Sequence, residues 1–206
     1  SYWKNSFELW NHALKVTKDN YLAHSNFATV MLLEGKYEEA LYHINQFISL
    51  KPKADSAYIK RGAIYFKLGQ NQSAMNDFNK AIILNPDVPD AYFNRGTVYY
   101  KLGQYQLAIE DLNRAFSPDR DDQLTNADVY YNRGNVYFKL NQYQQALEDY
   151  SHAISLKEDF ANAYSNRASV YFIQGNKESG CRDAQKACEL GNCKKIESAS
   201  NAGYCR

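Results

Sequence analysis

The sequence predicts an all-α fold in which helix hairpins stack into a solenoid, and two observations carry this prediction. A five-residue motif occurs five times, and its small last residue stands at positions 28, 62, 96, 134 and 168. Apolar residues within each copy follow the period of a helix, and such internal repetition is typical of solenoids. The copies are HSNFA at 24–28, YIKRG at 58–62, YFNRG at 92–96, YYNRG at 130–134 and YSNRA at 164–168.

Each repeat is expected to contain two helices. In the third copy, Tyr92, Gly96, Tyr99 and Leu102 are spaced i, i+4, i+7 and i+10, which places them on one face of a first helix. A residue suited to the left-handed conformation then ends that helix. These residues are Gly35, Gly69, Gly103, Asn141 and Gly175. Small residues open the second helix and recur seven positions later, which allows the two helices to approach closely.

The repeats account for most of the chain. Five units of 34 residues, with four residues inserted in the third, give the boundaries 21–54, 55–88, 89–126, 127–160 and 161–194. Residues 1–20 match a second helix without its first, and 195–206 form a C-terminal cap. Because a half-repeat is an awkward end for a solenoid, we expect the sequence to be part of a longer protein.

This pattern resembles the tetratricopeptide repeat (TPR), a helix-turn-helix unit that stacks into a right-handed superhelix. The resemblance rests on the aromatic, glycine, tyrosine, alanine and proline positions of five copies in register. It implies that the first helices line a concave groove. The tyrosines that recur at helical spacing are expected to be packing residues of the core.

An arginine before the small residue of the motif is followed 16 residues later by an aspartate in four repeats. The sequence predicts ion pairs inside each hairpin, and an anion-binding site is the alternative. The pairs are Arg61 with Asp77, Arg95 with Asp111, Arg133 with Asp149, and Arg167 with Asp183. The first repeat has Phe27 and His43 at these positions.

The groove of the resemblance would be lined by the opposite face of the first helices. Because an asparagine side chain donates and accepts hydrogen bonds, a row of them can hold a peptide backbone, as in the asparagine ladder of O-linked N-acetylglucosamine transferase. The alternative is that asparagine is simply common at this position. We expect Tyr100 and Tyr131 to be binding anchors whose truncation spares the fold. The candidate peptide-binding residues are Asn26, Phe66, Phe93, Asn94, Tyr100, Lys101, Tyr131, Asn132, Asn135, Phe138, Lys139 and Asn166.

Composition excludes several classes of function. With 24 basic and 23 acidic residues, the net charge of +1 argues against nucleic-acid binding. No apolar run is long enough to insert into a membrane. Motifs for phosphate loops, zinc proteases or serine nucleophiles are missing, so we expect no enzyme, cofactor or metal. The carboxylate clamp of chaperone-docking members of the family is also not expected, since Ser25 and Thr29 replace its lysine and asparagine.

All four cysteines follow residue 180. Cys181 and Cys188 would share one helix, about 10.5 Å apart along its axis, which is too far for a disulfide. A cap helix that folds back after Gly191 would bring Cys188 to Cys193 and Cys181 to Cys205. We therefore predict these two nested disulfides, with four free thiols in a reducing compartment as the alternative. The hypothesis of a structural zinc site built from these cysteines is weaker, because no C-x-x-C pair is present.

The first residues add a second resemblance. The stretch from Tyr2 to His24 is similar to the junction where multi-span, mannosyltransferase-like membrane proteins continue into a C-terminal TPR tail. It implies an extracytoplasmic (periplasmic or lumenal) domain, which suits the clustered cysteines, with a cytoplasmic location as the alternative. We expect a non-catalytic scaffold for a peptide or protein partner. The alternative is a domain that presents substrates to a membrane glycosyltransferase, and the oligomeric state is left open.

Overall fold

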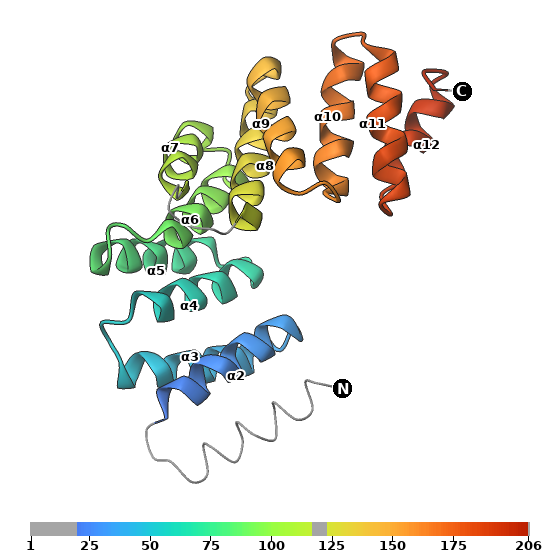
Figure 1. Ribbon diagram of the computed structural model, residues 1–206. Coiled ribbons are helices and arrows are strands. Elements are labelled where there is room, and N and C mark those ends of the chain that lie inside the picture. The colour runs from blue at the N-terminus through green and yellow to red at the C-terminus, as the bar shows by residue number, and fades with distance from the viewer. Residues whose placement is uncertain (1–19, 117–122, 206) are drawn as a thin grey trace. The chain divides into compact units, whose positions relative to one another are not determined.

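The computed structural model describes residues 20–116 and 123–205, and every regular element within these ranges is a helix, as predicted (Figure 1). The chain consists of two compact units, an N-terminal one that ends at Val98 and a C-terminal one that begins at Tyr99. The predicted half-repeat at 1–20, apart from Asn20, lies outside the described residues.

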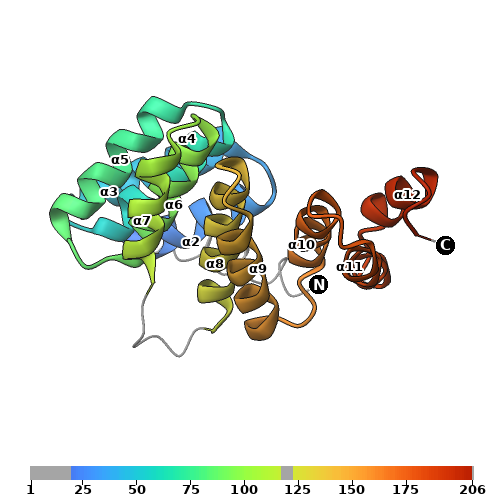
Figure 2. The ribbon, with the colours of Figure 1, turned by 90° about the horizontal axis from the view of Figure 1, so that it is seen from above.

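Each unit is a series of antiparallel helix hairpins. The N-terminal unit contains α2 (Tyr21–Leu33), α3 (Tyr37–Leu50), α4 (Asp55–Lys67), α5 (Asn71–Leu84) and α6 (Pro89–Lys101) as far as Val98. The C-terminal unit contains α7 (Tyr105–Ala115), α8 (Gln123–Lys139), α9 (Tyr143–Leu156), α10 (Ala161–Ile173), α11 (Lys177–Glu189) and α12 (Lys194–Asn201). Both views show α10 and α11 as neighbours, with α12 beside α11 (Figures 1 and 2).

The residues predicted to end the first helices have the left-handed backbone conformation expected of them. Gly69 has a φ of 76° after α4, and its amide and that of Gln70 bond to carbonyls in the last turn of the helix. Asn141 has a φ of 58° and closes α8 in the same way, since a short amide side chain tolerates the left-handed region. These turns reverse the chain within three residues and so make each hairpin tight.

The small residues of the motif let the two helices of a hairpin touch. A Cβ atom on Gly62 would lie 2.6 Å from the ring of Phe78, and one on Gly134 would lie 2.8 Å from the ring of Tyr150. Phe78 and Tyr150 are fully buried, so neither ring has room to move. The glycine is therefore required by close packing at both positions.

The four residues inserted between the third and fourth repeats are accompanied by a longer first helix in the fourth repeat. Helix α8 has 17 residues, whereas α4 has 13, and it begins at Gln123, four residues before the expected repeat boundary at 126/127. The insertion thus adds about one turn to the start of a first helix.

The C-terminal cap has the geometry that the sequence predicted. Gly191 ends α11 with a φ of 94°, and α12 folds back against α11. Disulfides join Cys181 to Cys205, with Cα atoms 5.5 Å apart, and Cys188 to Cys193, with Cα atoms 3.9 Å apart. Both ends of the cap are thereby tied to α11.

Candidate functional site

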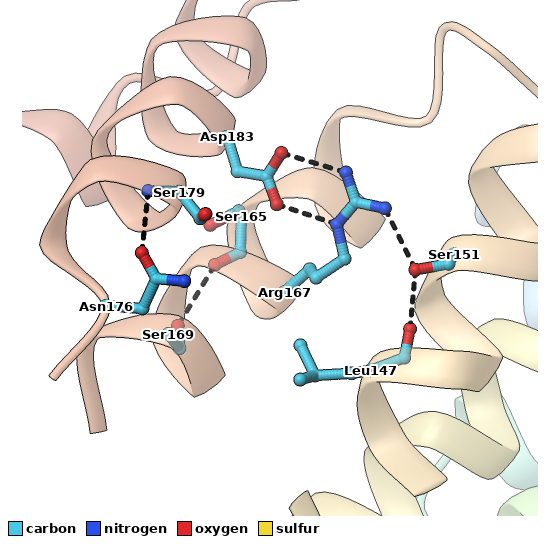
Figure 3. A network of polar contacts seen from close by, with 8 residues as sticks. All are labelled: Leu147, Ser151, Ser165, Arg167, Ser169, Asn176, Ser179 and Asp183. Atoms are coloured by element: carbon cyan, nitrogen blue, oxygen red, sulfur yellow. Dashed lines mark hydrogen bonds and ion pairs between the residues drawn. The ribbon is translucent and has the colours of Figure 1, made fainter. Parts of the chain in front are cut away.

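The recurring geometry of the arginines is clearest in the last repeat. Arg167 donates from Nε and Nη2 to the two carboxylate oxygens of Asp183, at 2.7 and 2.9 Å (Figure 3). Its Nη1 donates to Ser151 Oγ on α9, in the preceding repeat, at 3.0 Å. One guanidinium therefore joins the two helices of its own hairpin and the hairpin before it.

The same arrangement occurs in other repeats. Arg61 binds Asp77 through two hydrogen bonds of 2.8 Å, and Arg133 binds Asp149 at 2.8 and 2.7 Å, so these predicted contacts are present. The predicted pair of Arg95 with Asp111 would join the two units and remains a prediction. The additional partners were missed by the sequence reasoning, although they recur at one repeat position: Asn45 for Arg61, Asn79 for Arg95, Asn113 for Arg133 and Ser151 for Arg167.

Aromatic rings complete the surroundings of the guanidinium. The Arg133 guanidinium carbon lies 4.6 Å from the ring centre of Phe116, 5.5 Å from that of Tyr130 and 5.8 Å from that of Tyr137. Its side chain is only 19% exposed. Each nitrogen of the guanidinium donates one hydrogen bond, to Asp149 or to Asn113, and aromatic rings surround it. These contacts favour a role of Arg133 in holding the repeats together over the alternative of an anion-binding site.

The first repeat replaces the ion pair with a histidine pair. His24 Nδ1 and His43 Nδ1 lie 3.1 Å apart, and the His43 ring stacks on Phe27 at 4.8 Å. Burial lowers the pKa of His24, and burial together with the His24 charge lowers the pKa of His43. Only Glu39, one turn earlier on α3, acts against this change in the pKa of His43. The folded chain therefore favours the neutral form of both imidazoles.

This pair predicts a pH dependence of stability. Since both pKa values are lower in the folded chain, the unfolded chain binds more protons below about pH 6.5, and the free energy of unfolding should fall as the pH drops further. Thermal unfolding at pH 7.5 and 5.5 should show this loss for the wild type, and His43→Phe should reduce it. His152→Phe, at an exposed position on α9, is the control and should retain the wild-type dependence. Equal pH dependence in His43→Phe and wild type would contradict the prediction.

The candidate binding site is a small pocket of the C-terminal unit. It has a volume of about 200 Å³ and is lined by first-helix residues. The lining residues are Tyr100, Asn135, Phe138, Lys139, Asn166 and Ser169. All of them except Ser169 belong to the peptide-binding set expected from the sequence, and Tyr100 is half-buried, which raises its pKa.

Hydrogen bonds orient the two asparagines of this pocket. Asn135 Oδ1 accepts from the buried Tyr150 hydroxyl at 2.9 Å and from Asn166 Nδ2 at 2.7 Å. Asn166 Nδ2 also donates to the Tyr131 hydroxyl at 3.2 Å. These bonds use the oxygen of Asn135 and the nitrogen of Asn166. They leave the nitrogen of Asn135 as a donor and the oxygen of Asn166 as an acceptor, which is the pair that a peptide group requires.

The other predicted groove residues differ in their surroundings. Asn94 and Asn132 each donate to a carbonyl four residues earlier in their own helix. Tyr131 packs against Tyr150 and Phe160, so its truncation is expected to disturb the core, contrary to the expectation that it would spare the fold. The remaining positions are half-buried or exposed first-helix residues: Asn26, Phe66, Phe93 and Lys101. Of these, Phe66 packs against the core cluster that contains Phe78.

Tyr150 contributes to the site, and Lys60 is a second polar residue of interest, which lies in the N-terminal unit and outside the pocket. Tyr150 occupies the core position that is Phe78 in the second repeat, and only its hydroxyl makes it a part of the polar network. Lys60 occupies the row of Asn94, Asn132 and Asn166, and it donates to hydroxyl groups of the first repeat. The repeat alignment marks both as departures from the pattern.

Other kinds of site are not found in the described part of the chain. Residues 20–116 and 123–205 contain no group of three or more histidine, cysteine or acidic side chains arranged to hold a metal ion. None of the helices described has the length and hydrophobicity needed to cross a bilayer.

Comparison with known proteins identifies the repeat. The family model "TPR repeat" matches residues 62–103 and 96–141, and the model "Tetratricopeptide repeat" matches 127–160. With the helix hairpins described above, these matches make the chain a tetratricopeptide-repeat protein. No curated protein sequence matches it.

Solved structures support the same fold. MamA is 23% identical with a TM-score of 0.65, over 88% of this chain and 94% of its own. YrrB, described as a TPR protein with an unusual peptide-binding site, is 21% identical with a TM-score of 0.66, over 94% and 97%. A chain of the APC/C hetero-tetramer Cut9-Hcn1 is 18% identical with a TM-score of 0.87, over 92% of this chain but 38% of its own. At these identities the similarity concerns the fold.

Proposed function

We propose that this chain is a protein-interaction scaffold that binds an extended segment of a partner on the first-helix face of the C-terminal unit. The observation that carries the proposal is the oriented pair Asn135 and Asn166, which presents one donor and one acceptor at a pocket. Such a pair suits the peptide backbone, whatever the partner's sequence. Tyr100 and Phe138 provide apolar walls for side chains of the segment.

The pocket also suits a binding role in energetic terms. Its amide groups are held in place by neighbouring side chains, so little rotamer freedom is lost when a partner binds. Its aromatic members are the residue types in which binding energy concentrates. A role in presenting substrates to a membrane glycosyltransferase would use the same pocket and the same contacts.

The proposal is tested by selecting peptides from a random displayed library on the purified chain and measuring their affinities by fluorescence anisotropy. Asn166→Ala should weaken binding about tenfold, and Tyr100→Ala should weaken it by about tenfold or more. Asn162→Ala is the matched control, since Asn162 is exposed on the same helix one turn earlier and outside the pocket. Circular dichroism would check that each variant is folded. Failure to select any peptide, or equal losses in Asn162→Ala and Asn166→Ala, would refute it.

We further infer that the chain resides in an oxidising, extracytoplasmic compartment. The inference is supported by the two disulfides, which together use all four cysteines of the chain. Disulfides of this structural kind persist in secreted, periplasmic and lumenal proteins and are rare in reducing compartments.

A further inference from the structure

Lys60 in the N-terminal unit is a half-buried cation whose partners are neutral. Its Nζ donates to Ser25 Oγ at 2.8 Å and to Thr29 Oγ1 at 3.1 Å, and both acceptors lie on α2. Burial lowers the pKa of Lys60, and no carboxylate of the described residues acts against it. Burying a charge without an opposite charge is costly, so such a lysine is a feature that needs an explanation.

Lys60, Ser25 and Thr29 form a polar cluster in which some hydrogen-bond donors have no acceptor among the three residues. An ammonium group carries three N–H bonds, of which Ser25 and Thr29 accept two. The Thr29 hydroxyl donates to the Ser25 carbonyl at 3.0 Å, while the Ser25 hydroxyl accepts from Lys60 and keeps its own hydrogen to donate. One N–H of Lys60 and the O–H of Ser25 therefore remain for an acceptor, next to a positive charge.

The neighbouring surface has the same sign of charge. Ser25 also lines a hollow of about 670 Å³ whose apolar walls include Tyr21, Phe47 and Leu50. Of the described residues that line it, the charged ones are Lys51 and Lys53. An anionic group beside apolar side chains is the complement of this surface.

We propose that Lys60, together with Ser25, binds a side-chain carboxylate of an aspartate or glutamate in an extended acidic segment of the partner. The inference rests on the proposed function as a peptide-binding scaffold and adds to it a separate acidic contact in the N-terminal unit. A carboxylate fits better than a phosphate group, because the cluster offers one ammonium group and no arginine fork, whereas a phosphate group carries a charge approaching −2. Since Lys60 occupies the row in which later repeats have asparagine, the row changes from neutral to cationic at the second repeat.

The test uses the full chain and a displayed library of peptides with amidated C-termini. On the wild type, the selected peptides should be enriched in aspartate or glutamate at one position, and replacing that residue by its amide should weaken binding about tenfold. On Lys60→Met the enrichment should disappear, and the amide peptide should bind as it does to the wild type. Lys67→Met is the control, since it removes the same charge from an exposed position on α4 and should retain the enrichment.

The possible failures are distinguishable. If no peptide is selected, the proposed function fails together with this inference. If peptides bind but show no acidic position, or if Lys67→Met and Lys60→Met behave alike, only the carboxylate site is refuted. A preference for phosphoserine, or a requirement for a free C-terminal carboxylate in a parallel library, would also refute it. Circular dichroism and thermal unfolding would establish that Lys60→Met is folded, as expected when a half-buried lysine is replaced by an apolar chain of similar length.

Discussion

Replacing Asp149 by alanine should lower the free energy of unfolding by about 2 to 4 kcal/mol, because Arg133 then loses its partner inside the array. The two side chains are 19% and 5% exposed, so water can solvate the remaining guanidinium only in part. Arg133 would retain its hydrogen bond to Asn113 Oδ1 at 2.7 Å, which carries no opposite charge. Chemical denaturation followed by circular dichroism measures this difference.

The neighbouring Glu148 provides the matched control for this substitution. It is exposed on the same helix and accepts a hydrogen bond from Gln144 one turn earlier. Glu148→Ala should change the free energy of unfolding by less than about 0.5 kcal/mol. Asp149→Asn, which keeps one acceptor, should lie between the two. If Asp149→Ala were as stable as Glu148→Ala, the ion pairs would not hold the repeats together.

Removing the disulfide between Cys181 and Cys205 should release the C-terminal cap. Their sequence separation is 24, and in the chain-entropy model closing such a loop stabilises the fold by about 3.5 kcal/mol. Because repeats contact mainly their neighbours, the loss should be confined to α12 and the adjoining end of α11. In the variant with both cysteines replaced by serine, amide hydrogen exchange should accelerate in α12 and remain slow in α8 and α9.

Removing the second disulfide, between Cys188 and Cys193, should destabilise the fold less than removing the first. Cys188 and Cys193 are separated by only 5 positions, so removing their bond should cost about 2 kcal/mol in the same model. The measurement is preceded by counting free thiols in the purified, unreduced protein, where none are expected. Four free thiols would contradict both the disulfides and the extracytoplasmic location inferred from them.

The helices and the cap could be predicted from the sequence because their causes are local or repeated. A helix reversal at Gly69 needs a residue that tolerates positive φ, and the same need recurs in every repeat. The cysteine pairing follows from the rise of a helix, which separates Cys181 from Cys188. The Arg133 and Asp149 pair could be recognised because its spacing recurs at other arginines.

The details of the site could not be predicted, since they depend on contacts between repeats. Whether an asparagine faces a partner or its own backbone is decided by its neighbours: Asn132 bonds to its own helix, whereas Asn166 bonds to Asn135. The Tyr150 hydroxyl that orients Asn135 sits on a side chain that the pattern marks only as a core aromatic. The surroundings of Lys60 similarly depend on a hydroxyl group of the preceding repeat, to which its ammonium group donates.

We propose that a partner segment forms hydrogen bonds with the oriented asparagine pair of the C-terminal unit. The most direct test of this proposal is to record the side-chain amide resonances of the isotope-labelled chain while a selected peptide is added. The Asn135 and Asn166 resonances should shift to saturation with the peptide, while that of Asn162, one turn away on α10, should stay in place. Shifts at Asn162 without shifts at Asn135 and Asn166 would contradict it.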